Sequence, residues 1–177
     1  MGNAEALPAG GVQFMSAGTG VVHSEMNNGA ATCRFLQVWL TPDARGHEPQ
    51  YGSLQTTPDQ RRNRLLAILR GTGEPPAWHS ATQHPAAPRL HQDAAVFVSQ
   101  AEPGVSQEAV LEPGRQAYVV CIEGSLRVGG PEGEESLAAR EAAELVAGAR
   151  PLHVDLAAGE EGAHFMVIEM TQRPRRA

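Results

Sequence analysis

Between residues 91 and 170, apolar and polar positions alternate over short segments, as they do in strands that have one buried face. Turn-forming pairs such as Pro103-Gly104 and Gly129-Gly130 separate these segments. The predicted strands are residues 94–100, 107–111, 116–123, 125–128, 136–139, 143–146, 152–156 and 164–170. Residues 138–147 also fit a helix, because Ala and Glu are strong helix formers, so two assignments stay open there. About eight short strands at such spacing favour a sandwich, barrel or jelly roll.

The rest of the chain divides into an apolar start and a polar middle. Residues 11–40 contain short apolar runs with glycines, and residues 33–40 are predicted to form a strand. Residues 41–89 are rich in Pro, Gln and His, and they contain one predicted short helix at 60–69. The predicted division is a first β unit too short to close by itself, a polar linker, a second β unit and a tail, at residues 1–50, 51–89, 90–171 and 172–177.

The composition excludes some classes of function. The net charge is −6, no lysine occurs, and the one basic cluster is the tail with Arg173, Arg175 and Arg176, which is expected to be a solvated terminus. This balance argues against non-specific binding to nucleic acid, which requires clustered cations. No apolar run approaches the roughly 20 residues of a membrane-spanning helix, and the N-terminus lacks the features of a signal peptide. Cys33 and Cys121 lie in apolar segments and are predicted to be buried free thiols, which suits a reducing compartment. We therefore expect a cytoplasmic protein, or a nuclear one in a eukaryote, that binds neither nucleic acid nor membrane directly.

His23 and Glu25 are the candidate metal ligands of the first unit. They flank Ser24, and residues two apart in a strand point to the same face. An imidazole nitrogen and a carboxylate oxygen suit Fe(II), Mn(II), Ni(II) or Zn(II). Two ligands do not complete a site, and a polar pair on the surface of a strand has the same pattern. The residues by themselves leave both interpretations open.

Several segments resemble the pirin family of bicupins. The segment GVQFMSAGTGVVHSEM at residues 11–26 resembles the signature of the family, and LQVWL at residues 36–40 continues the match. Further similar segments are RNRLL at 62–66, LHQDA at 90–94 and QAYVVCIEGSL at 116–126. The resemblance implies an all-β fold of two cupin jelly-roll barrels. Here the C-terminal barrel at residues 90–171 is expected to be complete, and the N-terminal barrel at residues 1–50 to be partial.

The resemblance also implies a metal site of which this chain carries a part. In members of the family the N-terminal barrel holds one metal, usually iron, by three histidines and a glutamate, and His23 and Glu25 match two of these ligands. The other two histidines belong to a His-x-His strand before the motif, and residues 1–10 contain no histidine. We therefore expect an N-terminally truncated chain that binds Fe2+, or another divalent transition metal, weakly or not at all. The loop histidines that offer replacement ligands are His47, His79, His84 and His91.

Two functions from different classes follow from the resemblance. The first is a non-catalytic binding or regulatory module that forms a homodimer, or binds another protein, through its N-terminal strands. The second is a metal-dependent oxidoreductase similar to quercetin 2,3-dioxygenase, which cleaves a flavonoid-like small molecule with O2. In that case His23 is a metal ligand, and Glu25 is both a ligand and the catalytic base. Another chain or the loop histidines would then supply the missing ligands.

Overall fold

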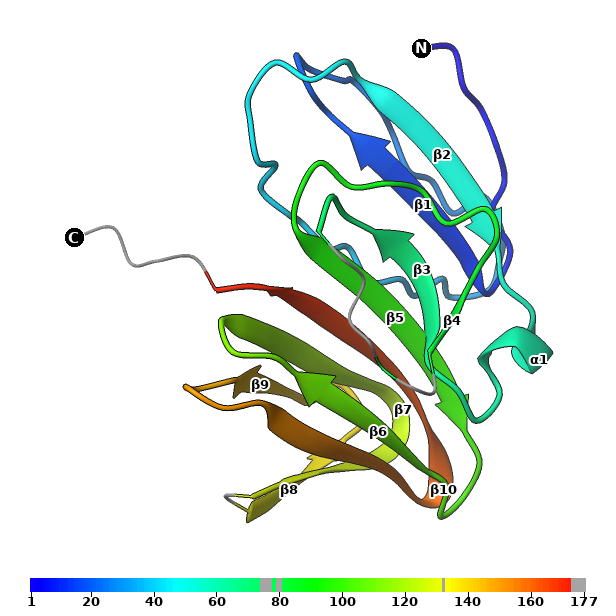
Figure 1. Ribbon diagram of the computed structural model, residues 1–177. Coiled ribbons are helices and arrows are strands. Elements are labelled where there is room, and N and C mark those ends of the chain that lie inside the picture. The colour runs from blue at the N-terminus through cyan, green and yellow to red at the C-terminus, as the bar shows by residue number, and fades with distance from the viewer. Residues whose placement is uncertain (74–77, 79–80, 132, 173–177) are drawn as a thin grey trace.

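The computed structural model describes residues 1–73, 78, 81–131 and 133–172, and its regular secondary structure consists of strands apart from one short helix (Figure 1). A separate sheet contains β1 (Gly11–Ser16) and β2 (Gln50–Gln55), and a short helix, α1 (Pro58–Arg61), follows it. The larger sheet contains β3 (Leu66–Arg70), β4 (Thr82–Gln83), β5 (Ala94–Ala101), β6 (Ser106–Leu111), β7 (Arg115–Gly130), β8 (Gly133–Ala138), β9 (Ala142–Val146) and β10 (Leu152–Thr171). Among the residues that the structure describes, no helix is long and apolar enough to cross a membrane.

Two long strands, β7 and β10, bend the larger sheet into two layers. The C-terminal half of β10 lies between β5 and the first half of β7, and β9 pairs with that half of β7. The N-terminal half of β10 lies between β6 and the second half of β7, which in turn pairs with β8. Each long strand therefore belongs to both layers, as in a jelly-roll barrel, and the predicted all-β cupin fold is confirmed for this part of the chain.

Glycines form the corner at which both long strands turn. The pairing of β10 with β7 shifts register between Ala158 and Ala163. Gly124 and Gly162 have φ of 75° and 79° at this point, and a Cβ on Gly124 would lie 2.1 Å from the carbonyl oxygen of Gly162. Only glycine allows this backbone conformation and approach without strain. The sequence predicted strand ends near residues 124 and 157–163, and in the structure these positions are bends within continuous strands.

The main hydrophobic core fills the space between the two layers. Its largest fully buried members are Phe165, Leu65, Leu111, Leu126 and Leu156. They come from both layers, since Leu111 lies on β6 and Phe165 on the second half of β10. Because burial of a Leu or Phe side chain contributes about 1.5–3 kcal/mol, this core is the main source of stability.

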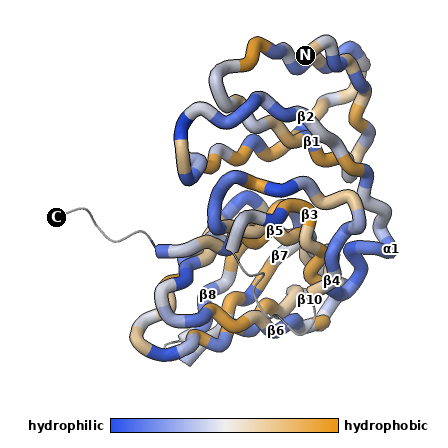
Figure 2. The backbone as a smooth tube through the Cα atoms, turned by 45° about the horizontal axis from the view of Figure 1, so that its top comes forward, coloured by the Kyte–Doolittle hydropathy of each residue, from blue (hydrophilic) through white to orange (hydrophobic). Residues whose placement is uncertain are grey.

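A second apolar cluster joins β1 and β2 to the outside of the barrel. Leu54 of β2 packs there with outward-facing residues of β3, β5 and β10, namely Leu66, Ile68, Val96, Val98, Met166 and Ile168. Val12 pairs with Leu54 across the two-stranded sheet and contacts the same cluster. Figures 1 and 2 show β1 and β2 lying over β3 and β5. The N-terminal sheet is thus attached by one apolar face to a barrel that is complete without it.

The segment predicted to be a polar linker, residues 51–89, is instead part of both sheets. The predicted helix at residues 60–69 is wrong beyond its first turn: α1 ends at Arg61, and Leu66–Arg70 form β3. Thr57 and Gln60 form a capping box that starts the helix. The apolar run in β3 is buried on both faces of the barrel wall, so it does not alternate with polar residues as a half-buried strand does. Without that alternation, its sequence also fits the apolar face of a helix. The other open assignment, at residues 138–147, resolves as the strand β9.

Candidate functional site

The candidate metal ligands His23 and Glu25 lie in the long connection between β1 and β2. Both residues are exposed, and neither belongs to a strand. The strand predicted at residues 33–40 is also absent there, and that segment is an extended, largely exposed loop. The prediction that His23 and Glu25 project from one strand face is therefore wrong, because no neighbouring strand pairs with this segment to fix its side chains.

The loop histidines are engaged elsewhere in the structure. His47 and His91 stack with ring centroids 3.8 Å apart, and His47 lies 2.9 Å from the Asp43 carboxylate. The hydrogen bond to His47 lowers the pKa of Asp43 below its ordinary value. His84 is buried, and its Nδ1 accepts a hydrogen bond from the Ala86 amide. His79 lies outside the described residues. The stacking of His47 on His91 fastens the end of the β1–β2 connection to the segment before β5.

The residues present do not fit a divalent metal site as they stand. Within the described ranges, no group of three or more His, Cys, Asp or Glu side chains is placed to hold one ion. A catalytic site of this kind needs at least three protein ligands with an open position for water or substrate. His23 and Glu25 supply at most two donors from an exposed loop.

Large apolar side chains of the same β1–β2 connection are exposed to solvent. Val22, Met26, Phe35 and Trp39 have exposed fractions of 104%, 76%, 66% and 84%. Cys33, predicted to be buried, is also exposed, whereas Cys121 is buried as predicted, and both thiols are free. Exposed apolar side chains grouped in one connection are candidates for contact with another chain.

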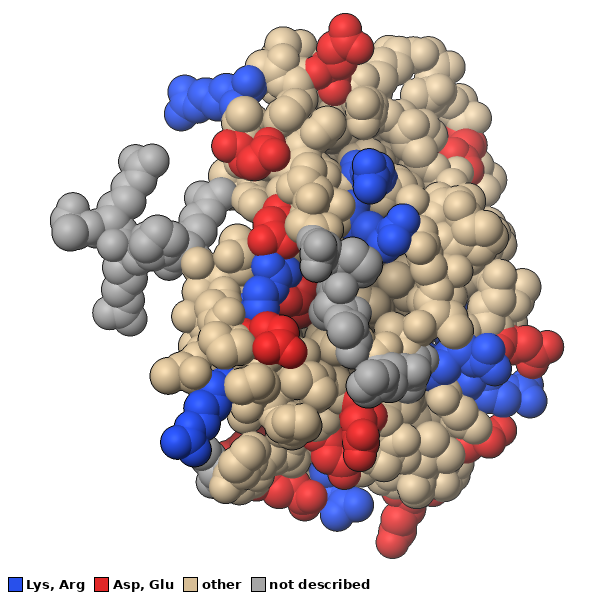
Figure 3. Space-filling model, viewed as in Figure 1, with Lys and Arg blue, Asp and Glu red and all other residues tan. Residues whose placement is uncertain are grey.

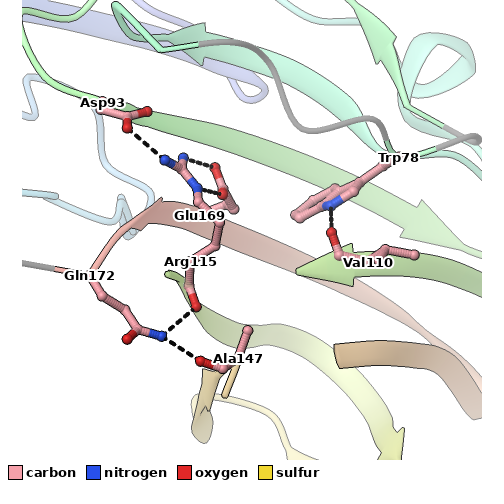
Figure 4. Close-up of polar contacts among 7 residues, drawn as sticks. All are labelled: Trp78, Asp93, Val110, Arg115, Ala147, Glu169 and Gln172. Carbon is pink, nitrogen blue, oxygen red and sulfur yellow. Dashed lines mark hydrogen bonds and ion pairs between the residues drawn. The ribbon is translucent and has the colours of Figure 1, made fainter. Parts of the chain in front are cut away.

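A buried ion cluster at one end of the barrel was not found from the sequence (Figure 4). Glu169 is 1% exposed and accepts hydrogen bonds from Nε and Nη2 of Arg115, and Nη1 of Arg115 lies 2.6 Å from the Asp93 carboxylate. Glu169, helped by Asp93, raises the pKa of Arg115 above its ordinary value. Gln172 donates to the carbonyl oxygens of Arg115 and Ala147, which fastens the end of β10. The signal available in the sequence was a glutamate inside the apolar run of residues 165–170.

A cavity of about 250 Å3 opens at this end of the barrel. Its apolar part contains Trp78 and Phe97, whose ring centroids are 4.4 Å apart, and Trp78 Nε1 donates to the Val110 carbonyl oxygen. Its polar part contains Asp93 and Glu169 together with Arg70, Arg89 and Arg115. No functional role was predicted for these residues from the sequence.

Comparisons with known proteins match both parts of the chain. The family profile described as "Pirin" matches residues 1–40, and the profile described as "Quercetinase C-terminal cupin domain" matches residues 79–170. A Pseudomonas aeruginosa protein, whose name describes it as a candidate quercetin 2,3-dioxygenase, is 38% identical over 143 residues, which are 80% of this chain and 58% of that protein. The quercetin 2,3-dioxygenase of Escherichia coli K12 is 29% identical over 140 residues, 77% of this chain and 54% of that protein.

A solved structure matches the arrangement of the whole chain. The crystal structure of YhhW from Escherichia coli has a TM-score of 0.65 with 14% identity, and the match covers 99% of this chain and 67% of that one. This likeness concerns the fold. The chain spans about half the length of the curated relatives it matches. Because the second profile covers more than half of its residues, and the first matches its N-terminal segment, the chain belongs to the pirin family of cupin proteins.

Proposed function

We propose that this chain is a non-catalytic binding module of the pirin family. The observation that carries the proposal is the position of His23 and Glu25, which are exposed in a loop with no third ligand grouped beside them among the described residues. The barrel of β3–β10 provides a stable body, and the connection between β1 and β2 provides the binding surface.

The binding surface fits another polypeptide chain. β1 and β2 form a two-stranded sheet, so each has an edge that pairs with no strand in the described part of the chain. The connection between these two strands also carries the exposed side chains of Phe35 and Trp39. A strand from a second copy or from a different protein would pair with such an edge, and its apolar residues would cover these side chains.

The alternative function is a metal-dependent reaction similar to that of quercetin 2,3-dioxygenase. Two relatives carry this activity in their names, and the "Pirin" profile covers both His23 and Glu25. If another chain supplied further ligands, His23 and Glu25 would hold Fe2+ or another divalent metal, and Glu25 would also take a proton from a flavonoid-like substrate. The isolated chain does not place these groups together.

Metal loading distinguishes the two functions. The purified chain is incubated with Fe2+ without oxygen and desalted, after which bound iron and quercetin-dependent O2 uptake are measured. If the chain is a non-catalytic binding module, we expect far less than one bound iron per chain and no quercetin-dependent O2 uptake. The substitution His23→Ala should then change neither value. The matched control is His153→Ala, which replaces another exposed histidine. One iron per chain that is lost in His23→Ala and Glu25→Gln but retained in His153→Ala would establish the metal-dependent alternative.

Light scattering tests the interaction surface separately. If the partner is a second copy of this chain, the average molecular mass should rise with protein concentration. The substitution Trp39→Ser should abolish this rise. A mass that stays monomeric over the whole range would show that copies of this chain do not bind one another, and a heteromeric partner would remain as the proposal.

A further inference from the structure

A β-bulge in β3 directs an arginine into the open end of the barrel. Leu66 and Ala67 pair with Val98 and Phe97 of β5, and the register then shifts so that Leu69 pairs with Val96 and Arg70 with Ala95. Paired residues share a face, and Ala95 and Phe97 both belong to the inner core. Without the extra residue, Arg70 would face outward instead. Bulges that redirect a side chain in this way are frequent beside functional sites.

Arg70 lies next to a second arginine in the same cavity. An isolated parallel bridge pairs Arg70 with Arg89, and both residues line the cavity, where Arg70 is half-buried and Arg89 is exposed. Arg115 binds Glu169 and Asp93, but neither Arg70 nor Arg89 has an ion pair among the described residues. The Nε of Arg70 is buried without a hydrogen-bond partner. Figure 3 shows basic side chains gathered near the centre of this face, close to the end of β3.

This arrangement is unfavourable unless something binds there. The Nε of Arg70 is a buried donor without an acceptor, which costs free energy, and Arg89 on the same cavity wall adds a second positive charge. The whole chain carries a net charge of −6, so carboxylates are plentiful elsewhere on its surface. A bound anion would neutralise both charges and accept the free hydrogen bond of Arg70.

The wall beside these arginines is aromatic and apolar. Trp78 and Phe97 are 4% and 2% exposed overall, yet both line the cavity together with Ala67 and Ala95. An apolar pocket with a few convergent polar groups is the usual form of a small-molecule site. An inorganic anion would use the arginines but leave the apolar wall in contact with water.

We propose that the open end of the C-terminal barrel binds a small organic carboxylate with a planar, apolar body. The carboxylate accepts hydrogen bonds from Arg70 and Arg89, since paired N–H donors match carboxylate geometry. The apolar body lies against Trp78 and Phe97. This site is separate from His23 and Glu25, so it does not depend on the function proposed for the N-terminal segment.

Trp78 provides a direct reporter for this site. The chain has two tryptophans, and Trp39→Phe, at an exposed position, leaves Trp78 as the only one. In this background, benzoate is expected to change Trp78 fluorescence saturably. Benzamide, which has the same shape without the charge, is expected to bind at least about tenfold more weakly, because a hydrogen bond to a charged group exceeds a neutral one. Inorganic phosphate is expected to bind more weakly than benzoate as well.

Two arginine variants and one control test which residues bind. Arg70→Gln and Arg89→Gln are each expected to weaken benzoate binding about tenfold, and Arg150→Gln, at an exposed position outside the cavity, is expected to leave it unchanged. The melting temperature of Arg70→Gln should equal or exceed that of the parent chain, because the substitution removes a buried donor that has no acceptor. Absence of saturable benzoate binding, equal binding of benzamide or phosphate, or equal effects of Arg70→Gln and Arg150→Gln would each overturn the proposal.

Discussion

Similar apolar patterns occur in the barrel of β3–β10 and in the β1–β2 connection. They form buried strands in the barrel and an exposed loop in the connection. Phe165 lies at the centre of the barrel and is fully buried, whereas Phe35 in the connection is 66% exposed. β10 around Phe165 pairs with β5 on one side and with β7 on the other. Residues 33–40 pair with no strand in the described part of the chain. An alternating apolar pattern therefore specifies a strand only where partner strands are present to cover it.

Thiol chemistry should give the largest difference between the two regions. Cys33 is exposed and Cys121 is buried, and burial raises the pKa of the Cys121 thiol. Since the thiolate is the reactive form and must be accessible, Cys33 is expected to react with a maleimide faster than Cys121 by orders of magnitude. Mass spectrometry should find one label per native chain and two after denaturation. Native Cys33→Ser should remain unlabelled, and rapid labelling of Cys121 in that variant would show that the barrel is open.

A matched pair of phenylalanine variants compares the two regions in free energy. Phe165→Ala should lower the free energy of unfolding by about 3–5 kcal/mol, since it removes apolar contacts and leaves a cavity. Phe35→Ala should change it by less than about 0.5 kcal/mol, as exposed substitutions do. Urea unfolding of both variants measures the difference. A loss for Phe35→Ala comparable to that for Phe165→Ala would mean that the connection is packed in solution.

Removing the cation of the buried ion cluster should have a smaller effect on the free energy of unfolding. Arg115→Gln leaves Glu169 enclosed without its cation, and we expect a loss of about 2–3 kcal/mol. This is below the value for a fully enclosed pair, because the side chain of Arg115 is 18% exposed. The control is Arg34→Gln, which removes an exposed arginine from the connection and should leave the urea midpoint unchanged. Equal midpoints for the two variants would show that the cluster does not stabilise the barrel.

The smallest expected effect is a pH dependence due to His164. Burial, and then the charge of Arg61, lower the pKa of His164 below 6.5, and Glu123 opposes this only in part. Below about pH 6.5 the unfolded chain therefore binds a proton more readily than the folded chain does. The free energy of unfolding decreases as the pH is lowered from about 6.5 to the folded-state pKa of His164. Thermal unfolding between pH 7 and pH 5 should show this fall, and His164→Gln should reduce it. His23→Gln, at an exposed position, should leave the fall intact; if both variants reduce it equally, His164 is not its source.

Much of the barrel could be predicted from the sequence, because its strands alternate regularly between inner and outer faces. The strands predicted at 94–100, 107–111 and 143–146 are confirmed as β5, β6 and β9. The continuity of β7 and β10 could not be predicted, because Gly124 and Gly162 look like turn residues and in fact allow a bend. β3 was missed because a run of apolar residues buried on both faces has no period of two.

The site was less predictable than the fold. The segment with His23 and Glu25 identifies the family, and the comparisons confirm that family. Its local pattern could not show whether partner strands are present, and these decide whether the two side chains are held together. The cluster of Arg115, Glu169 and Asp93 joins residues more than 20 positions apart in sequence. Only the pairing of β7 with β10, and the loop before β5, bring them together.

Hydrogen exchange of the intact chain at a dilution where it is monomeric tests the central claim most directly. That claim is a complete barrel joined to a connection, residues 21–40, that pairs with no strand in the described part of the chain. Mass spectrometry should show that peptides from residues 21–40 exchange as fast as unstructured peptides, while those from β5 and residues 163–170 of β10 are protected by pairing. Protection of residues 21–40 equal to that of β5 would contradict the account, because it would show that this segment is folded without any partner.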